Sequence, residues 1–370
     1  PGTSDLSGIA PTPPVIESLT KPSVPEDPET VLSDLGIGVK AANPAALVAQ
    51  IAEALEAGDL SKIGRLIGKD ALDSETIARL KALSTAPLKL RQPDGVREIG
   101  ELELNAHSRW ALELEGQEPG RDRIFIDLRR KDGKWSVEKI TLPPPAGEPI
   151  PKAVFADSLG VADGFLQAVL KQDFEFARAF VNPTSVSDAK IAGLCILFEE
   201  GEYHLRKNKP LRSMFHREDT VGYLANVETD GGKQSAQFAM TMKQPPAPSN
   251  WMVAEINLDQ LLADYARRVA GGDVYYSPLV KNPNGGDTLA LYFEFDEDEI
   301  NPRTRRQLEI VTSILQSDPG KKITLSGHTD SLGSEDYNAS LSSRRAGVVR
   351  DYLIKAGVAS SQIVTLGKGA

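Results

Sequence analysis

The chain has 370 residues, of which 40% are hydrophobic and 25% charged, so a fibrous or wholly disordered protein is excluded and two or three domains are expected. Its 42 basic and 52 acidic residues give a net charge of −10, which argues against a broad surface for nucleic acid or anionic lipid. The single cysteine, Cys195, excludes an intramolecular disulfide and cysteine zinc clusters. No apolar run reaches the ~18–20 residues of a membrane helix, so we expect any signal peptide or membrane anchor to lie upstream of Pro1.

Clusters of proline and glycine divide the chain into folded blocks and connecting segments. Residues 1–43 are rich in proline and acidic side chains, which predicts a largely disordered tether, although residues 32–39 could dock as a short strand or turn. Two further proline- or glycine-rich stretches, at 143–151 and 269–286, are predicted linkers. The folded blocks that remain are the first block, 44–142, the second block, 152–268, and the third block, 287–370.

The first and second blocks resemble each other in sequence. Each opens with a helical apolar pattern, then a turn with an aspartate and a second apolar run, so that Asp59 corresponds to Asp173. Each ends in a strand led by tryptophan, Trp135 in one and Trp251 in the other. Because the spacing of the two pairs differs by only two residues, the sequence predicts two tandem copies of one fold.

The hydrophobic period between these ends is two, which predicts antiparallel strands. Helices followed by such a meander indicate an α+β fold. The order resembles the cystatin-like cone fold of the nuclear transport factor two superfamily, which implies a curved sheet that wraps the opening helices and can leave a pocket. The strands are expected at 99–104, 108–114, 123–128 and 135–142 in the first block and at 220–228, 235–243 and 251–258 in the second.

A pocket of this kind holds a carboxylate or a histidine–aspartate pair in those superfamily members that are enzymes. The candidates here are His107, His204 and His216, and none falls in a pairing that the sequence can locate. We interpret them as ordinary surface or core-edge histidines, the three tryptophans as core residues, and Cys195 as a buried small hydrophobe. We therefore expect no catalytic residue, no metal and no cofactor.

The third block has the pattern of a βαβαβ unit. Its first helix begins at Asn301-Pro302, where asparagine can cap and proline suits the first turn, and ends at Asp318-Pro319-Gly320. The remaining elements are a strand at 289–296, a strand at 321–326, a helix at 338–356 and a strand at 362–366.

Arg345 is an anomaly in the second of these helices. It lies near the centre of an apolar stripe that includes Leu341 and Val349, whereas Arg344 is turned by ~100° and can reach solvent. A core-facing arginine needs a carboxylate partner, and Asp330, just after the preceding strand, is the candidate. The two side chains either neutralise each other as a structural pair or hold a zwitterion between them, with its ammonium at Asp330 and its carboxylate at Arg345.

The residues around this pair resemble the OmpA C-terminal-like domain. That family reads G-H-T-D, a short loop and N-x-x-L-S-x-x-R-A-x-x-V, which matches residues 327–330 and 338–349, and its Y-F-x-F-D strand matches residues 292–296. The resemblance covers residues 289–370. It implies a non-catalytic domain that binds peptidoglycan without a covalent bond.

The resemblance also implies a role for individual residues. The acid of the G-H-T-D turn holds the ammonium of diaminopimelate in the peptidoglycan stem peptide, and the arginine holds the matching carboxylate. The asparagine, which also suits a helix N-cap, lines the site. By position, the peptidoglycan-binding residues are Asp330, Arg345, Asn338, Asp296, Phe293 and Thr329.

Two positions depart from the family pattern. Leu332 stands where a small hydroxyl residue is common, so one contact to the stem peptide is expected to be missing. The sequence ends at Ala370, where the family continues through an arginine-rich segment and a final strand, so the domain is expected to be truncated. His328 and Asp330 are too few to indicate a metal site.

The leading hypothesis is therefore a non-catalytic protein of the periplasm of a Gram-negative-type bacterium. It would be tethered to the outer or inner membrane upstream of Pro1, anchor an envelope assembly to peptidoglycan, and contact other envelope proteins through the cone-like blocks. The alternative is a periplasmic enzyme or small-ligand carrier that uses the cone pockets and is merely localised by the third block. A third option is a flagellar-stator or secretion-machine component.

Overall fold

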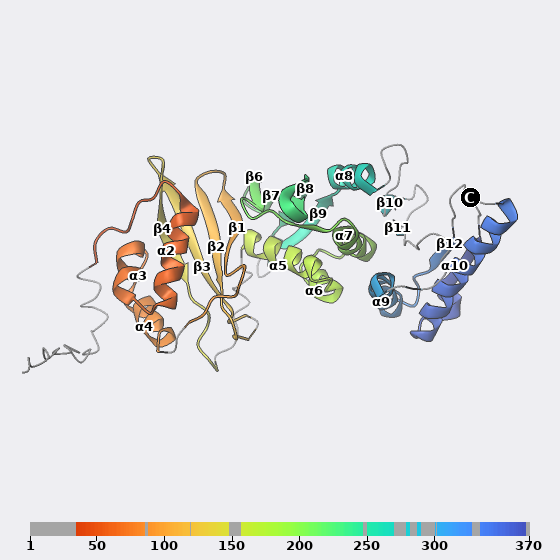
Figure 1. The fold of residues 1–370 in the computed structure, drawn as a ribbon, viewed down its shortest axis with the longest axis horizontal. Helices are drawn as coiled ribbons and strands as arrows, with labels where there is room; N and C mark the ends of the chain where they lie inside the picture. Colours follow the sequence, from red (N-terminus) through yellow and green to blue (C-terminus); the bar gives the residue numbers. More distant parts are fainter. Residues whose placement is uncertain are drawn as a thin grey trace, which may run out of the picture.

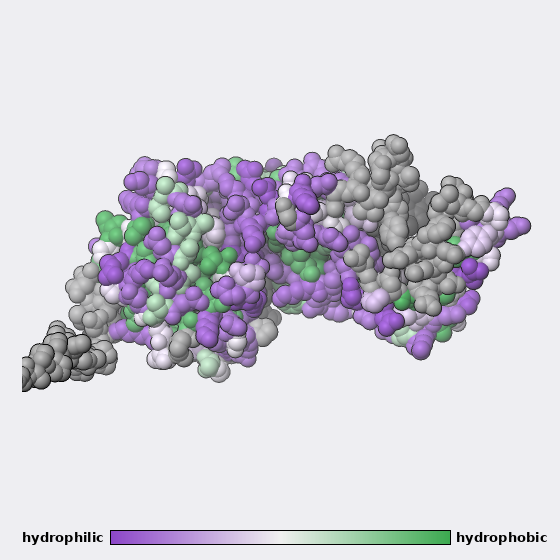
Figure 2. Space-filling model, in the orientation of Figure 1, coloured by the Kyte–Doolittle hydropathy of each residue, from purple (hydrophilic) through white to green (hydrophobic). Residues whose placement is uncertain are grey.

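The computed structural model describes residues 35–85, 88–118, 120–147, 157–246, 250–269, 279–281, 287–289, 300, 302–327 and 334–367. These residues form a mixed α/β structure in which the three blocks follow one another along the longest axis (Figure 1). No helix among them has the length and apolar character needed to cross a membrane. The face seen in Figure 2 is mostly hydrophilic, with hydrophobic residues in small separate groups.

The first block consists of helices followed by one antiparallel sheet. Each helix is capped by the side chain of the residue before it. Asn43 accepts a hydrogen bond from the Ala45 N–H, Asp59 from the Lys62 N–H and Asp73 from the Thr76 N–H. The strands pair in chain order, and the four predicted strands are confirmed. The elements are α2 (Pro44–Glu56), α3 (Leu60–Ile67), α4 (Ser74–Leu83), β1 (Val96–Glu103), β2 (His107–Glu113), β3 (Arg123–Lys131) and β4 (Lys134–Thr141).

The end of the predicted tether packs against this block. Ala41 and Trp135 exchange both backbone hydrogen bonds, at 2.8 and 2.7 Å, and the Val39 N–H donates to the Leu66 carbonyl at 3.1 Å. Leu35 also packs against the apolar core. The chain therefore joins the first block before residue 44, while residues 1–34 of the tether lie outside the described residues.

The second block has the same order of helices followed by a sheet. Strand β7 lies inside the sheet and pairs with β5, β6 and β8, and β8 pairs with β9. The strands predicted at 220–228, 235–243 and 251–258 are confirmed as β7, β8 and β9. The elements are α5 (Ser158–Leu170), α6 (Phe174–Arg178), α7 (Asp188–Glu200), β5 (Tyr203–Leu205), β6 (Leu211–His216), β7 (Thr220–Thr229), β8 (Ser235–Lys243), β9 (Met252–Asn257) and α8 (Asp259–Val269).

The turn between the first two helices is the same in both blocks. Asp173 caps α6 as Asp59 caps α3, each accepting a hydrogen bond from the backbone N–H three residues on. Gly58 and Gln172, which precede these aspartates, have φ angles of 65° and 59°. The shared turn agrees with a repeat, whereas the assignment of both blocks to the cystatin-like cone fold stays a prediction.

The predicted linkers contain ordered structure. The guanidinium of Arg79 donates to the carbonyls of Leu142 (3.2 Å) and Pro143 (2.6 Å), which holds the start of the 143–151 segment on the first block. In the 269–286 segment, β10 (Leu279–Lys281) pairs antiparallel with β11 (Asp287–Leu289). The strand predicted at 289–296 lies almost entirely outside the described residues.

The third block has the helices and later strands that the sequence predicts. Strands β12 and β13 are parallel, with Ile323 opposite Ile363 and Gly327 opposite Gly367. Buried Gln362 ties the block together, because its side-chain amide donates to three carbonyl groups at 2.9–3.1 Å. The elements are α9 (Pro302–Ser317), β12 (Ile323–Gly327), α10 (Glu335–Lys355) and β13 (Ile363–Gly367).

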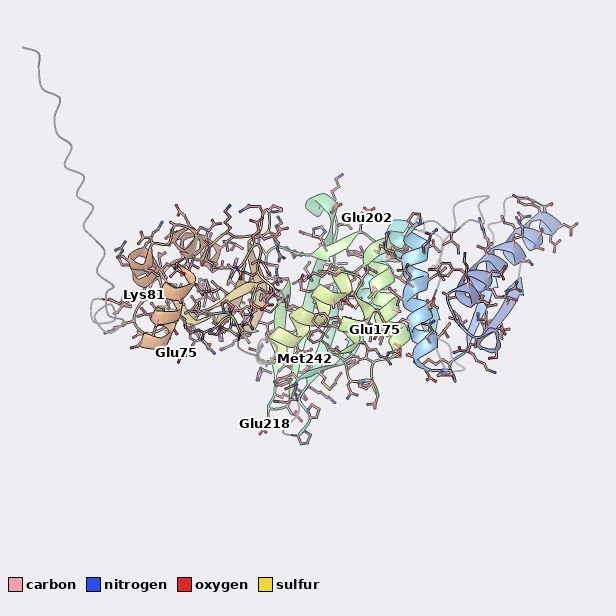
Figure 3. All side chains as sticks on the ribbon, turned by 90° about the horizontal axis from the view of Figure 1, so that it is seen from below. Glu75, Lys81, Glu175, Glu202, Glu218 and Met242 are labelled. Atoms are coloured by element: carbon pink, nitrogen blue, oxygen red, sulfur yellow. The ribbon has the colours of Figure 1, made fainter. Side chains whose placement is uncertain are left out.

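Helix α9 is shared between two cores. One face packs Leu308 and Val311 into the third block, whereas Ile310 and Ile314 belong to the core of the second block. Polar contacts surround this interface: the Gln307 amide donates to Glu200 at 2.8 Å, and Lys321 pairs with Asp188 at 2.9 Å. Arg306 pairs with Glu199, and the Ser313 hydroxyl donates to Glu175. Figure 3 shows Glu175 beside α9. The third block is therefore docked on the second.

A buried ion network joins the first and second blocks. Asp163 on α5 is 2% exposed and accepts from Arg97 on β1 at 2.7 and 3.1 Å. Arg109 on β2 pairs with Asp157 at 2.7 Å across the same boundary. Since Ile99 and Ala111 of the first block also belong to the apolar core of the second, the two blocks share a continuous interface.

Candidate functional site

The candidate site lies where strand β12 ends and helix α10 begins. In a parallel βαβ arrangement, the carboxyl end of the strand and the amino end of the following helix meet at one edge of the sheet. Strand β12 ends at Gly327, and α10 begins after Ser334, whose hydroxyl accepts from the Tyr337 N–H at 3.3 Å. Only residues 328–333 separate these points in the sequence.

Two of the six predicted site residues lie among the described residues, and both are on α10. These are Asn338 and Arg345. The other four, Phe293, Asp296, Thr329 and Asp330, lie outside them, so their roles stay predictions.

Arg345 lies within the buried arc of α10 but not at its centre. The fully buried positions are Asn338, Leu341, Ser342, Ala346, Val349 and Leu353. Their arc is centred near Val349, about 40° around the helix from Arg345. Arg345 is accordingly half-buried, and Arg344 is exposed, as the sequence predicts. The stripe expected from the sequence was therefore shifted, because Ala346 and Leu353 are buried whereas Val348 and Tyr352, on the other side of Arg345, are only half-buried. The position of Arg345 allows its stem to pack while the guanidinium reaches the surface.

The predicted capping role of Asn338 is wrong. The helix begins at Glu335, and Ser334 is its N-cap. Asn338 lies inside the helix, 3% exposed, and its N–H donates to the Ser334 carbonyl at 2.9 Å. The longer helix follows from its first turn, since Glu335 and Asp336 are acidic and favour a helix amino end. Asn338 can therefore support the site only from the buried side of α10.

Charges of both signs occur along α10 near the candidate site. The exposed carboxylates of Glu335 and Asp336 lie in its first turn, and the two arginines follow in its third. The amino end of the helix also presents backbone N–H groups and a positive dipole end. Glu335 and Arg345 are ten residues apart, about 15 Å along the helix axis, so the charges of α10 alone do not converge on one small group.

Outside this site, two histidines lie beside carboxylates: His204 is 3.6 Å from Glu228 and 3.8 Å from Asp230. His107 lies 3.1 Å from Glu138, and burial together with the neighbouring Arg129 lowers the pKa of its imidazole. Burial raises the pKa of the Cys195 thiol to about 12, so it is not an activated nucleophile. Among the described residues, no three His, Cys, Asp or Glu side chains are placed to hold a metal ion.

Comparisons with known proteins identify the third block. Residues 292–370 match the model of the OmpA family. A segment of 79 residues is 36% identical to the peptidoglycan-associated lipoprotein of Pseudomonas aeruginosa, over 21% of this chain and 46% of that protein. A segment of 80 residues is 38% identical to the peptidoglycan-binding protein ArfA of Mycobacterium tuberculosis, over 22% and 24%.

A solved structure is also similar to about a fifth of the chain. The peptidoglycan-associated lipoprotein from Burkholderia pseudomallei is 35% identical, with 21% of this chain and 67% of that chain covered and a TM-score of 0.20. The chain thus spans less than half the length of the two curated relatives named above. The family prediction made from the G-H-T-D and L-S-x-x-R segments is confirmed for residues 292–370.

Proposed function

Since residues 292–370 form an OmpA family domain, we propose that this protein binds peptidoglycan without a covalent bond and anchors an envelope assembly to the cell wall. The family match is the observation that carries the proposal. Relatives of the same segment are named peptidoglycan-associated lipoprotein and peptidoglycan-binding protein. The cell envelope is the corresponding location, and we assign the protein to the periplasm.

The ligand group in this proposal is the zwitterionic end of diaminopimelate in the stem peptide. Asp330 holds the ammonium, and Arg345 holds the carboxylate through a planar pair of N–H donors. The support for Arg345 is its place on α10, half-buried within the core-facing arc yet open to the surface. A guanidinium held by packing along its stem is pre-oriented for one carboxylate, which lowers the entropy lost on binding.

We assign the protein no catalytic activity. The interiors of the first and second blocks are filled by apolar side chains of the opening helices and the sheet, which favours a structural role for these blocks over a reaction site inside either one. Their exposed surfaces are assigned to contacts with other envelope proteins.

The test is co-sedimentation of the full-length protein with purified peptidoglycan sacculi. Asp330→Asn removes the charge that meets the ammonium, and Arg345→Lys keeps the charge but loses the bidentate fork. Each change should weaken binding by roughly 30- to 1,000-fold, because about 2–4 kcal/mol is lost when a ligand charge is left unpaired. Arg344→Lys, at the exposed neighbour, is the matched control and should bind normally.

The competing interpretation, in which Asp330 and Arg345 only neutralise each other, gives a different result. The same variants would then melt at lower temperature, and binding would fall only as far as folding fails. The full chain is needed for this comparison, because an isolated third block would expose Ile310 and Ile314 of α9. A folded Asp330→Asn protein with unchanged binding would contradict the clamp.

A further inference from the structure

A cavity lies between the first and second blocks, outside the candidate site. Its volume is about 470 Å³, within the range of ~300–1,000 Å³ that is usual for small-ligand sites. Strands β1, β2 and β4 and the start of α2 contribute one side, and the β5–β6 connection with strands β6, β7 and β8 contributes the other. Figure 1 shows β1 and β6 facing each other where the two blocks meet. We call this cavity the interblock cleft.

The wall from the first block carries hydrogen-bond acceptors. Glu98 and Glu101, both on β1, are 7% and 2% exposed. One oxygen of each is already engaged: Glu98 accepts from the Lys209 N–H at 2.9 Å, and Glu101 accepts from the Asn105 N–H at 3.1 Å. Burial raises the pKa of the Glu98 carboxyl above its ordinary value, as expected for a carboxylate that water hardly reaches.

The wall from the second block carries donors. Arg206, Lys209 and Arg212 line it together with the side-chain amides of Asn226 and Gln237. The cleft therefore sets cationic and amide groups opposite carboxylates, and the side-chain ammonium of Lys209 lies 3.5 Å from Glu101. A ligand between the walls must accept hydrogen bonds from the second block and donate hydrogen bonds to the carboxylates of the first block.

One contact across the cleft is incomplete. Glu101 Oε2 and Arg212 Nε are buried, and in the described part of the chain neither has a hydrogen-bond partner. They lie 3.9 Å apart, too far for a direct hydrogen bond. A hydroxyl oxygen about 2.8 Å from each atom would accept from the guanidinium and donate to the carboxylate, which satisfies both.

The charges in the cleft select against ions. A free anion would face the carboxylates of Glu98 and Glu101, and a free cation would face Arg206, Lys209 and Arg212. Leaving either charge next to its own sign costs binding energy. A neutral ligand rich in hydroxyl groups meets both walls without this cost.

Two tryptophans give the cleft its apolar surface. Trp135 is half-buried, and Trp110 uses its indole N–H within the protein, donating to Ser108 Oγ at 3.3 Å. Trp110 is 5% exposed and packs in the core of the first block, so the half-buried ring of Trp135 supplies most of the aromatic surface that a ligand can reach. Sugars combine hydroxyl edges with an apolar C–H face, which is the pair of surfaces that this lining matches.

From this lining we propose that the interblock cleft binds a short segment of a neutral, hydroxyl-rich glycan. The inference deepens the proposed function and rests on it, since the cell wall supplies such a glycan next to the stem peptide. The protein would then hold the wall polymer at two separate places, the peptide at the third block and the sugar chain between the first two.

The test uses a glycan without peptide, the β-1,4-linked tetramer of N-acetylglucosamine. The full chain has three tryptophans, and Trp251→Phe leaves only Trp110 and Trp135, both in the cleft. Titration should give a saturable change in tryptophan fluorescence. Gln237→Ala in this background should weaken binding about 5- to 10-fold, the effect of one hydrogen bond. Gln234→Ala, an exposed glutamine outside the cleft, is the matched control.

The outcomes separate this inference from the proposed function. Arg345→Lys should leave tetramer binding unchanged while it weakens sacculus binding. A protein that binds the tetramer but not sacculi would contradict the proposed function, and the cleft would then be a glycan site that does not serve the cell wall. The inference is overturned if no saturable change occurs up to about 10 mM tetramer, a limit weaker than a millimolar site. It is equally overturned if Gln234→Ala weakens binding as much as Gln237→Ala, or if a stem peptide alone gives the saturable change.

Discussion

The interface between the first and second blocks depends on Asp163, which makes Asp163→Asn a direct test of how the blocks are joined. The carboxylate is 2% exposed and accepts two hydrogen bonds from Arg97, while Arg123 lies 3.6 Å away. Asparagine keeps the shape and one acceptor but removes the charge. Among the described residues, Arg97 would then keep Glu113, at 3.2 Å, as its remaining carboxylate partner.

The expected loss is about 3 kcal/mol, the lower end of the ~3–5 kcal/mol that breaking a buried ion pair costs, because asparagine still accepts a hydrogen bond. A typical domain is stable by ~5–15 kcal/mol, so a loss of this size is measurable. Urea denaturation of the full chain at pH 7, followed by circular dichroism, gives the free energy of unfolding. Asp94→Asn is the matched control: Asp94 pairs with Lys207 across the same boundary at 3.5 Å, but that pair is exposed. Its removal should cost ~1 kcal/mol or less.

The pH dependence gives a second readout for the same residue. Burial alone would raise the pKa of the Asp163 carboxyl, but the charge and hydrogen bonds of Arg97 outweigh burial and lower it. The contribution to stability is therefore present above the unfolded-state pKa of about 4 and is lost as pH falls through the lower folded-state pKa. The difference in the free energy of unfolding between wild type and Asp163→Asn should be largest at pH 7 and should decrease in acid. Equal unfolding free energies at pH 7, or a difference that stays the same in acid, would contradict a stabilising role for the Asp163 carboxylate.

Three further predictions concern other parts of the fold. Ile314→Asp should lower the melting temperature of the full chain and make the connection between the second and third blocks more sensitive to protease, because it places a charge in the core of the second block. Gln316→Asp, at an exposed position of the same helix, should do less. Asp59→Ala and Asp173→Ala should each cost about 1 kcal/mol of unfolding free energy in urea titrations, because each removes a helix cap. Cys195, buried and with its pKa raised to about 12, should not react with a thiol reagent in the native protein at pH 8 and should react fully in denaturant; rapid native labelling would contradict its placement.

Periodicity and turn chemistry were enough to predict most strands of the first two blocks and the helices and later strands of the third. The alternation along the first sheet, the asparagine–proline start of α9 and the stop at Asp318 correspond to the observed elements. The apolar stripe that includes Leu341 and Val349 predicts that Arg345 lies on the inner side of its helix, and in α10 it lies within the buried arc. These features are local, so a single sequence contains them.

Elements that are stabilised mainly by contacts with residues far away in the sequence were not predicted. Helix α7 is buried on all sides from Ile191 to Phe198, so its sequence has no amphipathic period. Strand β5 has three residues, too few for an alternation to be recognised. The double-sided packing of α9 was also missed, because a face that contacts a second core looks like an ordinary apolar position in the sequence.

The cleft could not be predicted either, since its lining combines residues from two blocks. Glu98 and Arg212 are separated by more than a hundred residues, and each is unremarkable within its own strand. The only sequence feature related to the cleft was the repeat, which indicated that two similar sheets follow each other along the chain. It did not indicate that β1 of one block would face β6 of the other.

The central claim, that the third block holds the zwitterion of diaminopimelate, is tested most directly by comparing two soluble stem peptides that differ at one residue. Diaminopimelate and lysine both end in an ammonium, but only diaminopimelate carries the adjacent carboxylate that Arg345 is assigned to hold. Calorimetric titration of the full-length protein should show the diaminopimelate peptide binding roughly 30-fold or more tightly, as expected for about 2 kcal/mol from a paired carboxylate, and Arg345→Lys should remove most of that preference. Equal affinity for the two peptides in the wild-type protein, or a preference that survives in Arg345→Lys, would contradict the account.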